Sequence, residues 1–229
     1  MQEEKSLRPR GLHRTLWACW WLSAPVLIGW LTIPALAQNY ELGVGAGLGV
    51  YNDATVSGPA GQAEAGFNNS FAGSAWVSHD MYRRLGGEFR YTFGNNNLKL
   101  GSGGSRATMS AETHTIHYEL QVHFADRDAR TRAFVAIGGG AKRYTGKGPE
   151  QAFQPLSGVA VLTKTSQWVG VVAFGGGVKV RVGSNGMFRA EVRDYWSPVP
   201  TQVIAPAPGA NLGGWIHNIV PLVGFGFRF

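Results

Sequence analysis

The stretch Ile219-Val-Pro-Leu-Val-Gly-Phe-Gly-Phe-Arg-Phe229 decides the fold of this chain. Residues two apart lie on the same face of a β-strand. One face therefore holds Pro221, Val223, Phe225, Phe227 and Phe229. The other face holds small, aliphatic or charged residues, namely Val220, Leu222, Gly224, Gly226 and Arg228. Three aromatic side chains in register favour contact of the first face with lipid, and the alternative is an ordinary half-buried final strand.

This alternation, which ends on a phenylalanine, resembles the assembly signal of bacterial outer-membrane β-barrels. The pattern Trp215-Ile-His217, Pro221, Gly224 and Phe229 is similar to the end of the OmpA/OmpX-like family of small outer-membrane β-barrels. The resemblance implies an all-β fold, an eight-stranded antiparallel up-and-down transmembrane barrel. It also implies that the barrel-assembly machinery recognises the last strand through Phe225, Phe227 and Phe229.

Residues 1–37 are predicted to be a signal peptide, and residues 38–229 the outer-membrane β-barrel domain. Lys5, Arg8 and two further arginines precede an uncharged, apolar stretch that runs from residue 15 to residue 37. Ala35-Leu-Ala37 supplies small residues for cleavage, which is expected after Ala37. An uncleaved inner-membrane anchor is the alternative, because the stretch could span a bilayer. Pro34 should break the helix just before the cleavage site and favours cleavage.

Composition narrows the classes of protein that remain. Cys19 is the only cysteine and lies in the leader, so neither disulfides nor thiolate catalysis are expected in the mature chain. Two of the 33 glycines, Gly11 and Gly29, lie in the leader, and the 31 that follow argue against a helical domain. The net charge is +7 at pH 7. Lysines and arginines do not cluster as in nucleic-acid patches, so no nucleic-acid partner is predicted.

Eight segments are predicted to be strands: 39–51, 71–79, 85–93, 112–124, 132–144, 168–182, 187–196 and 214–229. Long loops are predicted at 52–70, 94–108, 145–167 and 197–213, and short turns at 80–84, 125–131 and 183–186. Within the third long loop, Val159-Ala-Val-Leu162 is a candidate extension of the strands beyond the membrane. An even number of strands with alternating long and short connections is typical of a bacterial transmembrane barrel with long loops outside. Pro221 cannot donate to a strand ladder, so we expect a bulge or a water molecule there.

Aromatic residues are predicted to form two girdles at the membrane surfaces. The outer girdle would contain Phe93, Trp168, Trp196 and Trp215. The inner girdle would contain Phe124, Phe188, Phe227 and Phe229.

The inward faces of the predicted strands collect charges of both signs. They are Glu41, Glu88, Arg90, Glu119, Lys142, Lys179, Arg181, Arg189, Glu191, Arg193 and Arg228. Buried charges must be paired or hydrated, and an eight-stranded barrel is only wide enough for its own side chains. We therefore predict a structural ion-pair network in the lumen, with a gated ion path or a general acid as the functional alternative.

No catalytic residue, cofactor site or metal site is predicted. Lipid A deacylases are enzymes with similar barrels and use a His-x-Ser pair, but none of the histidines here is followed by serine at that spacing. His114 and His117 would point to opposite faces of one strand, which separates them as metal ligands. The runs Gly138–Gly140 and Gly175–Gly177 lack the spacing of phosphate-binding loops.

The sequence thus predicts a non-enzymatic protein of the bacterial outer membrane. Its role would be structural or surface-interactive, through four mobile extracellular loops. Expected partners are outer-membrane lipid, lipopolysaccharide, the assembly machinery and an unidentified surface ligand. The alternatives are a lipid-modifying barrel enzyme, a narrow channel and a soluble lipocalin-like barrel, although a lipocalin should be apolar inside rather than outside.

Overall fold

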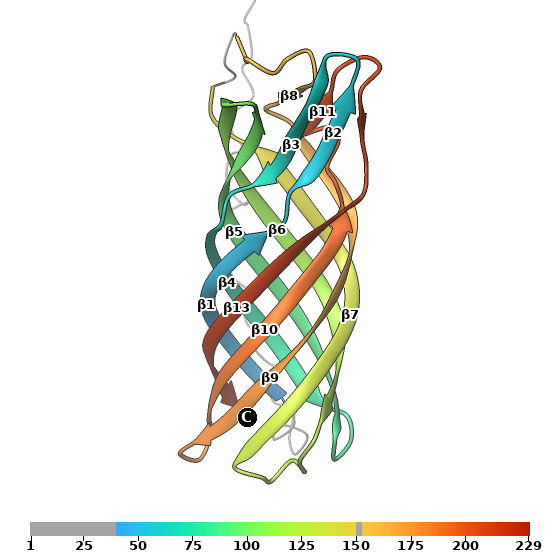
Figure 1. Cartoon of the computed structure of the whole chain (residues 1–229). Coiled ribbons are helices and arrows are strands. Elements are labelled where there is room, and N and C mark those ends of the chain that lie inside the picture. Colours follow the sequence, from blue (N-terminus) through green and yellow to red (C-terminus); the bar gives the residue numbers. More distant parts are fainter. Residues whose placement is uncertain (1–39, 150–152) are drawn as a thin grey trace, which may run out of the picture. The chain divides into compact units, whose positions relative to one another are not determined.

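The computed structural model describes residues 40–149 and 153–229, which form an all-β structure around eight long strands (Figure 1). The long strands are β1 (Tyr40–Tyr51), β4 (Ser70–Asp80), β5 (Leu85–Ser102), β6 (Ser105–His123), β7 (Thr131–Gly146), β9 (Ser166–Val182), β10 (Gly186–Pro198) and β13 (Trp215–Arg228). The short strands are β2 (Ala54–Gly58), β3 (Gly61–Phe67), β8 (Ala160–Leu162), β11 (Ile204–Pro206) and β12 (Asn211–Leu212). The predicted leader, with Cys19 and the cleavage position after Ala37, lies outside the described residues.

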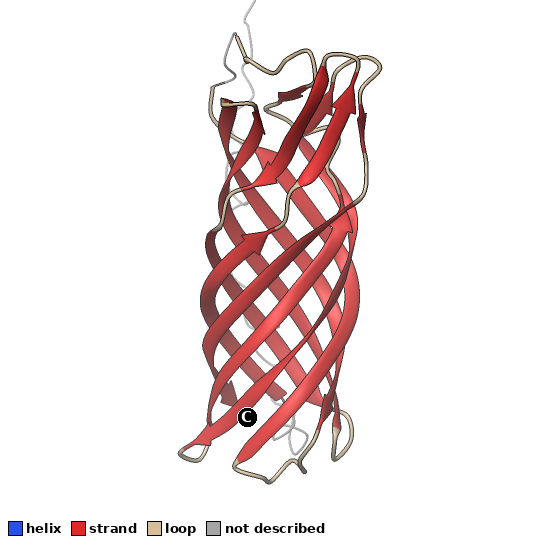
Figure 2. Ribbon diagram, in the orientation of Figure 1, coloured by secondary structure: helices blue, strands red, loops and turns tan. Residues whose placement is uncertain are grey.

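The eight long strands close into a ring. Antiparallel neighbours follow one another in the order β1-β4-β5-β6-β7-β9-β10-β13, and β13 pairs back onto β1. Figure 2 shows the strands tilted around a common axis. Backbone polar groups in hydrocarbon must find partners within the protein, and a closed ring supplies them. The predicted eight-stranded antiparallel barrel is confirmed. No helix among the described residues is long and apolar enough to cross a bilayer.

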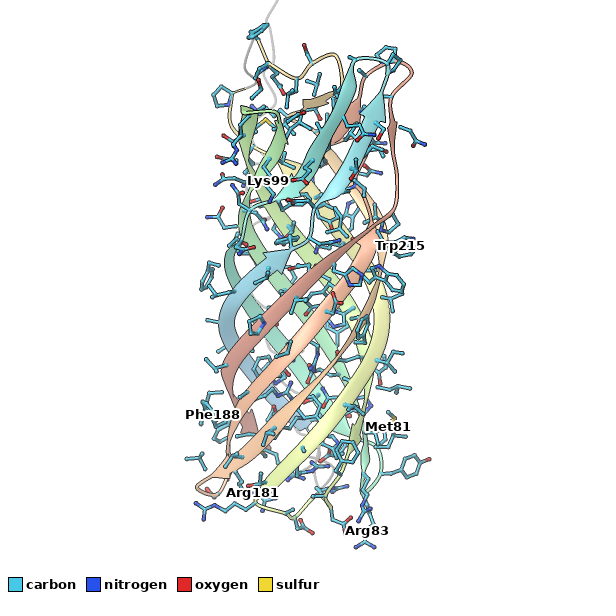
Figure 3. The ribbon with its side chains drawn as sticks, in the orientation of Figure 1. Met81, Arg83, Lys99, Arg181, Phe188 and Trp215 are labelled. Carbon is cyan, nitrogen blue, oxygen red and sulfur yellow. The ribbon has the colours of Figure 1, made fainter. Side chains whose placement is uncertain are left out.

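The outer surface of the ring is apolar. Outward side chains are exposed although they are aliphatic, as with Val44 (64% exposed) and Ile137 (63% exposed). Toward the end that carries the long connections, the rings of Trp196 and Trp215 lie 5.0 Å apart. Phe188 is exposed near the opposite end, and Figure 3 labels Trp215 and Phe188 at these two levels. The aromatic positions therefore bound an apolar belt, as the girdle prediction required.

Glycines on the inner face make room for a buried indole. Trp76 of β4 is 1% exposed and lies inside the ring. A Cβ atom at Gly43 of β1 would collide with the Trp76 ring, and one at Gly224 of β13 would lie 2.5 Å from Trp76 Cη2 and 2.7 Å from the carbonyl oxygen of Val44. A large side chain thus occupies the space that two small residues on neighbouring strands leave free.

The ladder between β1 and β13 is interrupted next to Pro221. Pairs run up to Gly47–Leu222 and resume at Val50–Ile219 in the same register, so no residue is inserted. On its other edge β13 pairs continuously with β10, including Val192–Pro221. The expected bulge is therefore wrong, and the alternative of a water molecule at Pro221 stays a prediction. The strand instead leaves a short gap in pairing on the side facing β1, where proline offers no N–H.

The long connections contain more strand than was predicted, and β8 (Ala160–Leu162) falls where a strand extension was expected. Strands β5 and β6 continue through 94–108 and turn at Gly103 and Gly104, whose φ angles of +53° and +89° favour glycine. Residues 54–67 form the hairpin β2–β3, which pairs through β3 with the outer part of β5. β8 pairs with β11, and β12 pairs with β2. We call this assembly, at the end of the barrel opposite the C-terminus in Figure 1, the head.

An apolar core holds the head together. Its fully buried members include Val56, Ala65, Phe67, Leu98, Leu100, Tyr144, Ala160, Val203, Ile204 and Ile216. The side chain of Gln154 both donates to and accepts from the backbone of Leu162, at 2.9 Å each, which fixes the connection before β9. Burial of each large aliphatic side chain contributes roughly 1.5–3 kcal/mol. All four long connections therefore contribute residues to a packed core, and the mobility expected of them stays a prediction.

We predict that Gly224→Leu destabilises the barrel by about 1–3 kcal/mol, because the larger side chain would overlap Trp76 and the β1 backbone. Gly170→Leu is the matched control, since nothing lies within 4 Å of a Cβ atom there. Urea unfolding of the detergent-refolded chain, followed by the heat-dependent shift on an SDS gel, measures the difference. Equal midpoints for the two variants would contradict the account of the Trp76 site.

Candidate functional site

The lumen holds a charge-balanced cluster of eight side chains, which we call the lumen network. Its acids are Glu41, Glu88, Glu119 and Glu191, and its bases are Arg90, Lys179, Arg189 and Arg193. All eight are 7% exposed or less. Side chains alternate between the two faces of each strand. The apolar residues point outward to lipid, and the charged residues next to them in the chain point inward, where they face one another.

Arg189 is the central cation of the lumen network. Its guanidinium lies 3.1 Å from Glu41 Oε1, 2.7 Å from Glu88 Oε2 and 3.5 Å from Glu191 Oε2. Arg90 joins Glu88, at 2.6 Å, to Glu191. The network thereby ties β1, β5 and β10 across the barrel, and each ion in it has a counter-ion as burial requires.

Neutral side chains complete the lumen network, and sequence reasoning did not assign them to it. Gln121 Nε2 donates to Glu88 Oε2 at 2.8 Å and to Glu119 Oε1 at 2.9 Å, and so connects two acids. Trp76 Nε1 donates to Glu41 at 2.9 Å, while its ring lies 4.5 Å from the Arg189 guanidinium carbon. Gln121 occupies an inward position of its predicted strand, whereas the strand that contains Trp76 shows no clear alternation in the sequence. Only the closed ring shows that both side chains reach charges on other strands.

Lys142 was predicted to belong to this network but lies apart from it. Its Nζ atom is buried without a hydrogen-bond partner. It lies instead 5.2 Å from the ring centre of Tyr51, 5.0 Å from that of Tyr144 and 5.8 Å from that of Tyr195. Contact with aromatic faces stabilises a cation. This tyrosine cage marks the level at which the charged lumen ends and the apolar head core begins.

Arg181 and Arg228, also predicted for the lumen, lie at the rim near the short turns. Arg181 donates to the backbone oxygen of Arg127 at 2.9 Å, and Arg228 lies 3.4 Å from Asp80 Oδ2. Asp80 also pairs with Arg132 at 3.2 Å. These groups form a separate ion cluster at the end of the barrel, because the last inward positions of β9 and β13 lie beyond the lumen network.

The lumen has almost no free space at this rim. The cavity there has a volume of about 10 Å³ and is bounded by Glu41, Asp80, Lys179 and Arg228, among others. A volume of that size holds about one water molecule. At the other end the head core lies above the tyrosine cage, so side chains fill the barrel from end to end.

A hydroxyl, an imidazole and a carboxylate adjoin one another on the outer surface. Tyr91 Oη lies 2.7 Å from His114 Nδ1, and His114 Nε2 lies 3.4 Å from Glu112 Oε1. Lys147 pairs with the same carboxylate, and its hydrogen bond holds the pKa of Glu112 below its usual value. A phenol is a weak nucleophile unless a base activates it, and here the carboxylate that would orient the imidazole is shared with a lysine.

The head carries a solvent-open groove of about 560 Å³ between the β2–β3 hairpin and the β5–β6 turn. Its polar lining comprises Thr55, Gln62, Glu64, Ser102, Ser105 and Arg106. We call it the head groove. No group of three or more metal-ligating side chains occurs within the described residues. Hydrogen-bonding groups together with one cation and one anion can hold a polar ligand.

Comparisons with known proteins find distant structural likenesses only. The sequence matches no known family model and no curated protein. Among solved structures it is similar to Neisserial surface protein A, with 12% identity over 83% of this chain and 96% of that chain, at a TM-score of 0.49. It is also similar to the N-terminal β-barrel domain of Pseudomonas aeruginosa OprF, with 13% identity over 83% and 98%, at 0.42. The outer-membrane protease OmpT from Escherichia coli matches with 12% identity over 82% and 97%, at 0.41.

These likenesses concern the fold and carry no activity to this chain. The closed ring with its apolar belt itself identifies a β-barrel of the outer-membrane type, because only closed barrels and helices satisfy the backbone within a bilayer.

We predict that Arg189→Met destabilises the barrel by about 3–5 kcal/mol, because it leaves buried carboxylates of the lumen network without their counter-ion. Arg106→Met removes an exposed cation in the head and should change stability by less than about 0.5 kcal/mol. Denaturant unfolding in detergent micelles at neutral pH compares the two. If Arg189→Met left the free energy of unfolding unchanged, the lumen network would contribute little to stability.

Proposed function

We propose that the protein is a non-enzymatic integral protein of the bacterial outer membrane that displays the head as a rigid interaction surface. The observation that carries the proposal is the apolar core of the head, which packs the long connections against one another. A barrel that served only as a membrane anchor would need only short loops at these positions. The long connections of such barrels lie outside and the short turns in the periplasm, so we expect the head on the outside of the cell. The predicted leader with cleavage after Ala37 is consistent with export.

A closed lumen argues against the channel alternative. The lumen network and the tyrosine cage fill the barrel, and the head core covers its outer end. An ion would have to displace paired charges and apolar side chains to cross. The charges inside and the apolar belt outside likewise argue against a soluble lipocalin-like barrel.

The head groove is the part of this surface best suited to a ligand. It combines backbone and hydroxyl groups at Gly101–Ser105 with the oppositely charged Glu64 and Arg106. Charge pairs at a solvent-exposed site steer a partner and set its orientation more than they add affinity. We expect a polar ligand at the cell surface.

Partner contacts in the membrane follow from the same placement. Arg143 on β7 pairs directly with Trp168 of β9, and Lys147 follows the end of β7. Cations at this level suit the phosphates of lipopolysaccharide. Phe225, Phe227 and Phe229 are exposed on β13, as a strand signal for the assembly machinery requires.

A lipid-modifying enzyme is the second candidate, favoured by the contact of Tyr91 with His114. It predicts that cells expressing the protein acquire altered lipid A and that Tyr91→Phe abolishes the change. We expect no change in lipid A for either form, because Glu112 is engaged by Lys147. Mass spectrometry of extracted lipid A distinguishes the two candidates.

We predict that an epitope inserted between Gly103 and Gly104 is accessible on intact Gram-negative cells and leaves the heat-dependent gel shift intact. A Cβ at either glycine meets nothing within 4 Å, so the turn is open. The same epitope between Ser184 and Asn185, in the opposite turn, should be accessible only after the outer membrane is permeabilised. Labelling of the second site alone on intact cells would reverse the proposed orientation.

A further inference from the structure

We propose that the turn between β4 and β5 binds the phosphate of an anionic phospholipid in the periplasmic leaflet. The site is an external groove of about 590 Å³ lined by Tyr82, Arg83, Arg84, Leu85, Val122 and Asp126. We call it the arginine groove. The inference rests on the proposed outer-membrane location and orientation, and it adds a specific lipid contact at the periplasmic end.

The floor of the arginine groove is apolar and belongs to the lipid-facing wall. Leu85 of β5 and Val122 of β6 are directly paired, and Val122 is 47% exposed. Phe124, two residues further along the chain, is 64% exposed and lies at the level of the inner aromatic girdle. An acyl chain that runs along this wall would bring its headgroup to the turn beyond the girdle.

The roof of the arginine groove consists of two guanidinium groups fixed by one carboxylate. Arg84 Nε lies 2.9 Å from Asp126 Oδ1, and Arg83 Nη2 lies 3.1 Å from Asp126 Oδ2. The hydrogen bond from Arg84 and the charge of Arg83 hold the pKa of Asp126 below its usual value, so the carboxylate stays ionised at neutral pH. Asp126 engages one nitrogen of each guanidinium, Nη2 of Arg83 and Nε of Arg84.

The two arginines retain donors for a ligand. The Arg83 side chain is 86% exposed and that of Arg84 is 64% exposed, and Figure 3 shows Arg83 extending beyond the end of the barrel. A planar guanidinium binds phosphate through two parallel hydrogen bonds, which lysine cannot provide. Two positive charges against one negative leave a local excess of +1 for the phosphate.

The whole rim reinforces this charge. The three short turns and the strand ends beside them carry Arg83, Arg84, Arg127, Arg130, Arg132, Arg181 and Arg228 against Asp80, Asp126 and Asp128, a formal charge of +4 for these residues. An anionic leaflet surface attracts such basic residues. The apolar floor favours a lipid over a free phosphate ion, because only a lipid could contact the apolar wall with its acyl chain and the two arginines with its phosphate.

The test uses the full chain in lipid nanodiscs of phosphatidylcholine that contain a minor fraction of phosphatidylglycerol. Native mass spectrometry after transfer to detergent measures the phosphatidylglycerol retained per barrel. Arg83→Gln with Arg84→Gln is expected to lower retention about tenfold, since two charge-assisted contacts are lost. The control combines Lys99→Gln with Lys164→Gln, which removes the same charge from the head and should leave retention unchanged.

Three results would overturn the proposal. They are equal retention in the arginine variant and the native chain, equal loss in the control, and displacement of phosphatidylglycerol by inorganic phosphate alone, which would indicate an adventitious anion only. The heat-dependent gel shift verifies that each variant is folded. The nanodisc assay does not depend on cellular location. If the arginine variant loses lipid as expected but epitope labelling is reversed, the proposed location or orientation is overturned. If epitope labelling is as expected but the arginine variant retains its lipid, only the arginine groove is overturned.

Discussion

The need to satisfy every backbone hydrogen bond without water governs this molecule. An open sheet in hydrocarbon would expose two edges of unpaired N–H and C=O groups, so β13 must return to β1. The return is imperfect only beside Pro221, where two pairs are missing on the β1 side while the β10 side remains continuous. The ring thus tolerates a proline because one intact ladder still holds the strand in register.

Closure inverts the usual distribution of side chains. The outward face must be apolar for lipid, and the inward face, too narrow for a solvent-filled channel, receives the charges. Four carboxylates and four cations balance there, with Arg189 in contact with three of the acids. Partners that come from different strands also specify register, since a slip by one residue would place these charges in lipid. We regard the lumen network as the interior counterpart of the apolar belt.

The arrangement of apolar side chains outside and charged side chains inside does not continue into the head. Along β5 the apolar residues Phe89, Tyr91 and Phe93 point outward, whereas Leu98 and Leu100, at positions of the opposite parity, are buried in the head core. Water surrounds the head, so the ordinary arrangement of apolar inside and polar outside returns. The tyrosine cage around Lys142 lies at this change of polarity. The change of parity is a signal present in the sequence, and the glycine and asparagine content of 94–108 concealed it because that composition is typical of loops.

The sequence by itself determined the pattern of the long strands, their number in the ring and their outward register, since alternation with period two is a local property of the chain. It also placed Glu88, Arg90, Arg189 and Glu191 on inward faces, for the same reason. Only the tertiary structure decided which charges meet, that Lys142 lies among tyrosines and that Arg181 and Arg228 lie at the rim, because these relations depend on strand tilt and on contacts across the ring. The packed head likewise required the tertiary structure: its core joins segments far apart in the chain, such as Leu98, Leu162 and Ile204, and no local pattern specifies which of them meet.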